Sequence, residues 1–237
     1  MEGGTPIRAV IFDFDGTLVD FVNSDIACIT DIYQDIKISA GLDDFIDRAV
    51  FHIMRFHELV DLGKVDPLYM DQYRLFHTFR DFGIAWKDSL VSIYKERLLQ
   101  HTKPYPGIIP FLQKLYGHVK LGILTNAYDP VMQTRRIQSA GLSAFFNQVQ
   151  IAGEEEYAKP DPKAFHKICT KLGCMPSECL FIGDSPEYDI AGAKSAGMKT
   201  ILIQRGDINI KIKPDHTVRS PDQIETVLKG IDCMAML

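Results

Sequence analysis

Near its N-terminus the chain has an unbroken apolar run, Ala9-Val10-Ile11-Phe12, which leads straight into Asp13-Phe14-Asp15-Gly16-Thr17. A short apolar run that stops at Asp-Gly is typical of a buried strand of a parallel sheet. In open α/β sheets, ligands bind outside the carboxyl ends of the strands. Side chains of an extended chain repeat every second residue, so Asp13 and Asp15 start on the same side. The residues therefore predict a site with two carboxylates, and the simpler alternative is a turn whose acids only cap the next segment.

The second half of the chain alternates short apolar runs with helical patterns. The predicted strands are residues 119–124, 148–152, 179–182 and 200–204, and the predicted helices are residues 109–116, 129–141, 162–172, 186–197 and 221–229. Repeated strand-helix units predict an α/β fold, with a Rossmann-like parallel sheet and helices on both of its faces.

Between the first strand and this repeat, the pattern is helical throughout. Apolar residues at helical spacing predict four helices, over about residues 26–36, 45–60, 67–76 and 87–100. A crossover between parallel strands needs only about a dozen residues, so a block of this length reads as an inserted domain. We expect an α/β catalytic core of residues 1–18 and 105–237, with an all-helical cap domain of residues 19–104 over Asp13 and Asp15.

The composition limits the classes of partner. Of 237 residues, 46% are hydrophobic and 24% are charged, and the net charge of −5 comes without any block of like charge. This balance gives no sign of a nucleic-acid or membrane partner. Neither a signal-peptide pattern nor a membrane-spanning apolar run is visible. We predict a cytoplasmic, soluble protein, whose oligomeric state the sequence leaves open with a monomer favoured.

The cysteines fit the same compartment. None of the five forms a Cys-x-x-Cys pair, which argues against a disulfide framework or a zinc site. They are Cys28, Cys169, Cys174, Cys179 and Cys233.

Three further polar positions lie next to predicted elements of the core. Thr125-Asn126 follows one predicted strand, Asp184 and Asp189 follow another, and Lys159 precedes Pro160. Each has a simpler interpretation, as a helix cap or a solvated lysine. Because the carboxyl ends of parallel strands share one edge of a sheet, we expect these residues to gather beside Asp13.

These motifs resemble those of the haloacid dehalogenase-like (HAD) hydrolase superfamily. Residues 13–20, Asp-Phe-Asp-Gly-Thr-Leu-Val-Asp, match its first motif, Asp-x-Asp-Gly-Thr/Val-Leu/Val, and the three other positions follow in the family's order. The resemblance covers the whole predicted core. It implies a phosphatase branch with a helical cap, acting on a small phosphorylated metabolite.

The resemblance also implies the roles of the residues. Asp13 would be the nucleophile that forms an aspartyl-phosphate, and Asp15 the general acid and base. Asp13, Asp184 and the backbone carbonyl of Asp15 would supply the oxygen ligands that Mg²⁺ prefers. Thr125, Asn126 and Lys159 would bind the phosphoryl oxygens, and Asp189 would orient Lys159 or a metal-bound water. 

Several alternatives stay open at this point. Dehalogenases of the superfamily lack the second aspartate and the metal, so Asp15 and Asp184 favour an alkoxide leaving group. A phosphomutase uses the same two carboxylates, and a non-catalytic regulatory protein could keep the fold. No substrate follows from Asp20 or from the polar residues of the predicted cap, which on such helices are more often solvated or packed than bound to ligand. Those residues are His52, Arg55, His57, Arg74, His77 and Arg80.

Overall fold

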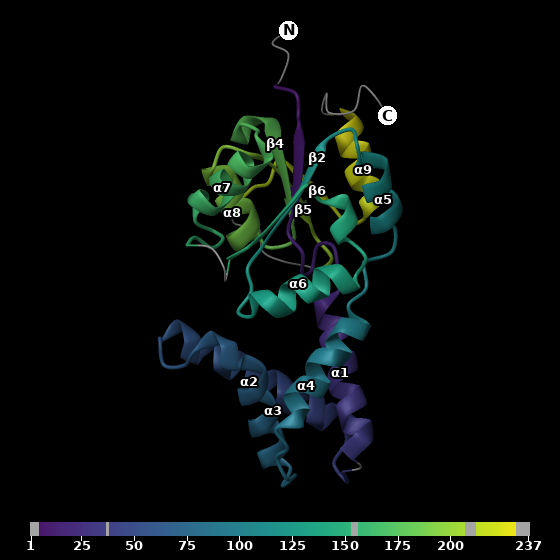
Figure 1. Ribbon diagram of the computed structural model, residues 1–237, viewed down its shortest axis with the longest axis vertical. Helices are drawn as coiled ribbons and strands as arrows, with labels where there is room; N and C mark the ends of the chain where they lie inside the picture. The colour runs from purple at the N-terminus through teal and green to yellow at the C-terminus, as the bar shows by residue number, and fades with distance from the viewer. Residues whose placement is uncertain (1–4, 37, 153–155, 207–211, 231–237) are drawn as a thin grey trace. The chain divides into compact units, whose positions relative to one another are not determined.

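The computed structural model describes residues 5–36, 38–152, 156–206 and 212–230. These residues form two compact units (Figure 1). The α/β unit comprises the described residues of 1–20, 104–130 and 140–237, and the helical unit comprises those of 21–103 and 131–139. Among the described helices, none has the length and hydropathy needed to cross a membrane.

The α/β unit is built on a six-stranded parallel sheet with the strand order β3-β2-β1-β4-β5-β6. Strand β1 (Ala9–Phe12) pairs with β2 (Lys120–Thr125) on one side and with β4 (Cys179–Gly183) on the other. The register sets Phe12 beside Ile123 and Ile182, so Asp13 emerges between two neighbouring strand ends. The remaining strands are β3 (Gln148–Ile151), β5 (Lys199–Ile203) and β6 (His216–Val218).

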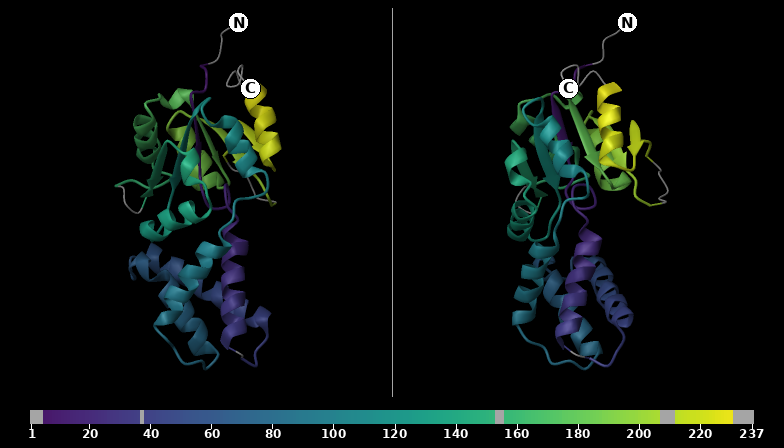
Figure 2. Two further views of the ribbon diagram at one scale, coloured as in Figure 1. Left: turned by 45° about the vertical axis from the view of Figure 1, so that its right-hand side comes forward. Right: turned by 90° about the vertical axis from the view of Figure 1, so that its right-hand side faces the viewer.

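Helices cover both faces of this sheet, which confirms the predicted fold class (Figure 2). On one face lie α7 (Pro162–Leu172) and α8 (Ala191–Ser195), and on the other lie α5 (Ile108–Leu115) and α9 (Pro221–Gly230) (Figure 1). Ile11 packs into the cluster that contains α7, whereas Phe12 meets Phe111 of α5 edge-on at 6.3 Å. All four residues of β1 are buried, because its alternate side chains face two apolar layers.

Two features of the α/β unit differ from the sequence prediction. Strand β6 was not predicted, because its three residues contain a single buried side chain, Val218. The helix predicted over residues 186–197 begins as a π-helical turn, η5 (Pro186–Ile190), before it continues as α8. Short 3₁₀ turns, η2 (Ser143–Phe145) and η4 (Pro176–Glu178), precede β3 and β4.

The helical unit contains the four predicted helices. They are α1 (Phe21–Ile36), α2 (Leu42–Asp61), α3 (Met70–Asp81) and α4 (Ser89–His101). The predicted start at Asp66-Pro67 is a 3₁₀ turn, η1 (Pro67–Tyr69), in which the Asp66 side chain accepts a hydrogen bond from the Leu68 N–H. Residues 131–139 of α6 (Pro130–Ser139) belong to this unit, and Met132 lies in its hydrophobic core.

The apolar residues of α2 are not all buried. Val50 lies on this helix but is 44% exposed. The buried positions are instead Phe45, Ala49, His52 and Phe56. His52 fits inside because its Nε2 lies 2.8 Å from an Asp81 carboxylate oxygen, which replaces the hydrogen bond that water would make.

Candidate active site

Asp13 stands where β1 ends, and the residue is 5% exposed. Its N–H donates to the Ile182 carbonyl of β4 at 2.9 Å, so the parallel ladder holds its backbone in place. Burial raises the pKa of the Asp13 carboxyl, and the nearby Lys159 ammonium opposes this rise. A buried carboxylate of this kind needs a cation beside it to stay ionised.

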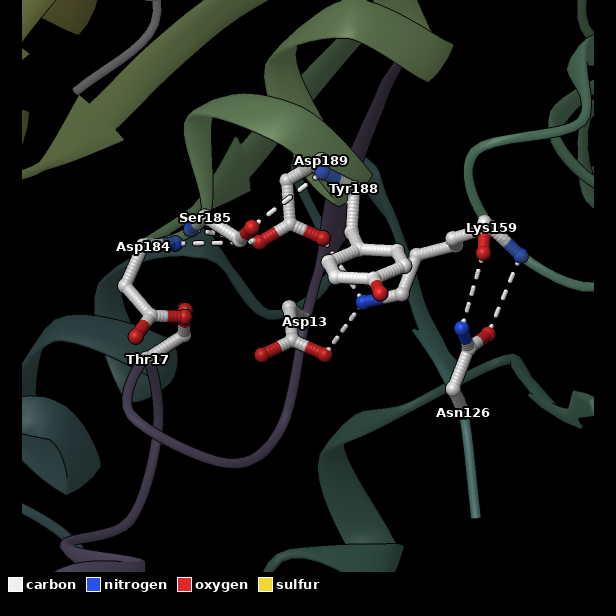
Figure 3. A network of polar contacts seen from close by, with 8 residues as sticks. All are labelled: Asp13, Thr17, Asn126, Lys159, Asp184, Ser185, Tyr188 and Asp189. Carbon is white, nitrogen blue, oxygen red and sulfur yellow. Dashed lines mark hydrogen bonds and ion pairs between the residues drawn. The ribbon is translucent and has the colours of Figure 1, made fainter. Parts of the chain in front are cut away.

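Lys159 supplies that cation from the turn before α7. Its Nζ lies 2.5 Å from Asp13 Oδ1 and 2.7 Å from Asp189 Oδ1 (Figure 3). The residue is 6% exposed. Burial alone would lower the pKa of this lysine, but Asp13 and Asp189 together raise it. Lys159 is therefore a fixed positive charge between two carboxylates.

Asn126 holds the backbone of Lys159 from the end of β2. The Asn126 Nδ2 donates to the Lys159 carbonyl at 2.9 Å, and the Lys159 N–H donates back to Asn126 Oδ1 at 3.0 Å (Figure 3). Both polar atoms of the Asn126 amide are thus engaged with one peptide segment. Thr125, the last residue of β2, is buried beside it.

The π-helical turn after β4 brings Asp189 back to the strand end. Asp189 Oδ2 accepts the N–H groups of Asp184 and Ser185 at 3.1 and 3.0 Å, while its Oδ1 accepts Lys159. This close approach requires Gly183, because a Cβ there would lie 2.3 Å from Asp189 Oδ2. π-Helical turns are rare and concentrate at functional sites.

A second tight approach joins the first motif to Asp184. Gly16 has a φ of +77°, and a Cβ on it would lie 2.2 Å from Asp184 Oδ2. The hydroxyl of Thr17 donates to Asp184 Oδ1 at 3.3 Å. The turn after β1 therefore packs directly on the acid that follows β4.

The carboxylates of Asp13, Asp184 and Asp189 form a cluster that suits a divalent cation. One oxygen from each lies within 4.8 Å of the others. Burial, and next the charge of Asp189, raise the pKa of Asp184 to about 6. The cluster sets three carboxylates against the single ammonium of Lys159. Hard oxygen donors with surplus charge fit Mg²⁺.

Comparison with known proteins identifies the family that shares this site. The family model of haloacid dehalogenase-like hydrolases matches residues 7–197. The chain belongs to this family. The predicted HAD membership is thereby confirmed, and every motif residue named from the sequence falls inside the matched segment.

Relatives match along nearly the whole chain. Human N-acylneuraminate-9-phosphatase is 32% identical over 254 residues, and the match covers 98% of this chain and 97% of that protein. Glyceraldehyde 3-phosphate phosphatase of Methanopyrus kandleri is 29% identical over 243 residues, with 95% and 98% covered. Among solved structures, the HAD-hydrolase YfnB of Bacillus subtilis shares the fold, with a TM-score of 0.78 at 21% identity over 94% of this chain and 99% of that one.

Most of the predicted site residues of this HAD-like hydrolase meet in one place. Asp13, Lys159 and Asp189 are in direct contact, and Asp184 completes the acidic cluster. Asp15 lies in the turn after β1, partly exposed, where it forms a bridge with Val19. The roles that the family resemblance implies for these residues stay predictions.

The polar candidates of the helical unit have varied surroundings. Arg74 is buried and its Nη1 contacts both carboxylate oxygens of Asp25 at 2.9 Å. Arg55 and Arg80 are exposed and pair with Glu58 and Asp81. His57 and His77 are partly buried, and burial lowers the pKa of both.

Sequence reasoning missed two residues of the site. Thr17 belongs to the quoted motif but received no role. Arg205 follows β5, and its Nη1 and Nη2 donate to the carbonyls of Gly16 and Thr17. Asp184 was predicted because it is a polar residue just beyond an apolar run. Arg205 also lies just beyond an apolar run, so the same criterion could have predicted it.

Proposed function

We propose that this protein is a Mg²⁺-dependent phosphatase that hydrolyses a small phosphomonoester through an aspartyl-phosphate on Asp13. The observation that carries the proposal is the contact of Asp13 with Lys159 inside a cluster of three carboxylates. A phosphate ester is an anion, so an anionic nucleophile needs cations at the point of attack. The relatives in human and in Methanopyrus kandleri are named phosphatases of phosphorylated metabolites, which supports a phosphoric monoester hydrolase.

In this proposal Asp13, Asp184 and the backbone carbonyl of Asp15 hold the magnesium ion. When bound, the ion offsets the charge of the carboxylate and of the phosphate. Asp189 instead positions Lys159, because its two oxygens already accept three hydrogen bonds, from Lys159 and from the N–H groups of Asp184 and Ser185.

Asp13 attacks phosphorus as a carboxylate, a form that the Lys159 ammonium favours. The Lys159 ammonium donates hydrogen bonds to the phosphoryl oxygens and offsets their negative charge as the bond forms. The Thr125 hydroxyl and the backbone N–H of Asn126 donate hydrogen bonds to those oxygens. The Asn126 side chain keeps Lys159 at its position.

Asp15 donates a proton to the departing alkoxide and later takes one from the water that hydrolyses the intermediate. A halide leaves without a proton. The presence of Asp15 and Asp184 therefore favours an ester over a haloacid as substrate. We assign the helical unit the role of a cap domain that selects the substrate, without naming that substrate.

The test is phosphate release from p-nitrophenyl phosphate and a panel of phosphomonoesters, with Mg²⁺ or with EDTA. We expect Mg²⁺-dependent turnover that Asp13→Asn abolishes. Asp222→Asn is the matched control, because Asp222 is an exposed acid in the first turn of α9. Turnover that persists in Asp13→Asn contradicts the assigned nucleophile. Isomerised phosphate esters without release of phosphate would identify the phosphomutase alternative.

A further inference from the structure

Arg205 makes a fork-shaped contact with the turn that carries Asp15. The residue lies just beyond β5, and its Nη2 donates to the Thr17 carbonyl at 3.2 Å while Nη1 donates to the Gly16 carbonyl. A guanidinium is planar and presents several donors at fixed angles, so it can hold two neighbouring acceptors at once. A lysine at this position could not reproduce the geometry.

Tyr105 completes the contact from the other side. The guanidinium carbon of Arg205 lies 3.6 Å from the centroid of the Tyr105 ring. The Tyr105 N–H donates to the Leu18 carbonyl at 2.9 Å, and Asp20 hydrogen-bonds its hydroxyl. The ring on which Arg205 stacks therefore belongs to a segment that is bonded to the same turn.

Backbone hydrogen bonds within the turn use other carbonyls than those of Gly16 and Thr17. Gly16 N–H donates to the Val19 carbonyl at 2.9 Å, and the N–H groups of Leu18 and Val19 donate to the Phe14 carbonyl at 2.9 and 3.1 Å. These bonds leave the carbonyls of Gly16 and Thr17 for Arg205. The same two residues contact Asp184, through the tight approach at Gly16 and through the Thr17 hydroxyl.

We propose that Arg205 is a positioning residue, which holds the Gly16–Thr17 turn so that Asp15 stays where proton transfer to the leaving group requires it. The inference rests on the proposed phosphatase function. Asp13 and Lys159 are held by other groups, namely the β1–β4 ladder, Asn126 and Asp189. Loss of Arg205 should therefore leave the nucleophile Asp13 in place and make the turn that carries the general acid Asp15 more mobile.

This division predicts a loss that depends on the leaving group. p-Nitrophenolate leaves readily without a proton, whereas an alkoxide needs one from Asp15. In Arg205→Ala we expect kcat/KM to fall for both esters, because the Asp15 carbonyl and Asp184 of the proposed Mg²⁺ site lie on or against the same turn, but to fall about tenfold further for the best alkyl phosphate of the panel than for p-nitrophenyl phosphate. Asp15→Asn should show the same pattern with a larger difference.

Arg205→Lys and Arg219→Ala complete the set of variants. Arg205→Lys keeps the positive charge but loses the planar pair of N–H donors. Its kcat/KM on the alkyl phosphate should therefore lie between the values of Arg205→Ala and of the natural chain. Arg219 is an exposed arginine that follows β6, so Arg219→Ala should match the natural chain on both esters. Equal losses on the two esters in Arg205→Ala, or no loss, would overturn the proposal.

Amide hydrogen exchange gives a readout that does not need activity. Arg205→Ala should lower the protection of the Leu18, Val19 and Tyr105 amides and leave that of Ile11 in β1 unchanged. Unchanged protection of the three turn amides overturns the positioning role. If Arg205→Ala does not fold, Arg205→Lys provides both measurements. A natural chain without phosphatase activity contradicts the proposed function, and the exchange result alone then decides whether Arg205 holds the turn.

Discussion

Each unit of the molecule contains a buried ion pair, and the two pairs differ in what surrounds them. In the helical unit, Arg74 from α3 pairs with Asp25 of α1, whose Oδ1 also accepts the Tyr94 hydroxyl of α4 at 2.5 Å. Arg74 stacks on the Tyr94 ring at 4.6 Å and is 1% exposed. Burial alone would lower the pKa of Arg74, but Tyr94 and Asp25 raise it.

In the α/β unit, by contrast, one lysine faces three carboxylates, and backbone groups take part. Asp189 accepts two backbone N–H groups, and Gly16 and Gly183 let acids approach the main chain. The helical network instead joins side chains of three neighbouring helices, and its acid accepts only from side chains in the contacts described above, while Nε and Nη2 of Arg74 have no hydrogen-bond partner among the described residues. The two buried ion pairs therefore differ in net charge and in backbone contacts. Surplus charge of one sign, held at strand ends by backbone contacts, is what indicates a place for a ligand.

The largest effect that tests this contrast should come from Lys159→Met. It leaves Asp13 and Asp189 without their shared cation, so we expect kcat to fall about a thousandfold. The free energy of unfolding should fall by about 3–5 kcal/mol, since a buried charge loses its partner. Turnover assays and urea denaturation measure the two effects. Activity close to that of the natural chain would contradict the role of Lys159.

Arg74→Met should destabilise the protein about as much, roughly 3–5 kcal/mol, because Asp25 loses its buried partner. The double variant Arg74→Met with Asp25→Leu should recover much of that stability, since it removes both charges. Under conditions where the single variant is folded, kcat for p-nitrophenyl phosphate should stay within about threefold of the natural value. A far larger loss of kcat in the folded variant would show that the helical network contributes to the reaction, which contradicts the difference drawn between the two ion pairs.

Gly183→Ala tests the backbone contacts of the site. The added Cβ would meet Asp189 Oδ2 and displace the group that positions Lys159. We expect kcat/KM to fall by about tenfold to a hundredfold. Gly230→Ala is the matched control, because its Cβ would meet no heavy atom within 4 Å. Equal activities of the two variants would show that Asp189 tolerates displacement.

Stabilisation by Mg²⁺ tests the acidic cluster without any substrate. At about a hundred times its Kd, the ion should raise the free energy of unfolding by about 2.7 kcal/mol, because only the folded chain assembles the carboxylates. Thermal denaturation with and without Mg²⁺ measures the shift. Asp184→Asn should abolish it, and Asp222→Asn should retain it. Full stabilisation in Asp184→Asn would place the cation elsewhere.

Much of the α/β unit could be predicted because its strands are short apolar runs. Strands β1, β2, β4 and β5 are buried along most of their length, so both faces of each strand must be apolar and the run is visible in the sequence. The edge strand β3 is less apolar, and its Val149 is 38% exposed. Parallel strands also bring their carboxyl ends to one edge. That rule was enough to predict that Asp13, Lys159, Asp184 and Asp189 would gather.

The sequence by itself determined the positions of strands β1 to β5, the helical block and the residues that meet at the strand ends, since these depend on local patterns. The tertiary structure decided which polar residues are buried. His52 and Arg74 pair with acids 29 and 49 positions away, and Arg205 reaches the Thr17 carbonyl 188 positions away. A local pattern records which faces of an element are apolar. Whether a charge can be buried depends on partners that only folding brings within hydrogen-bonding distance.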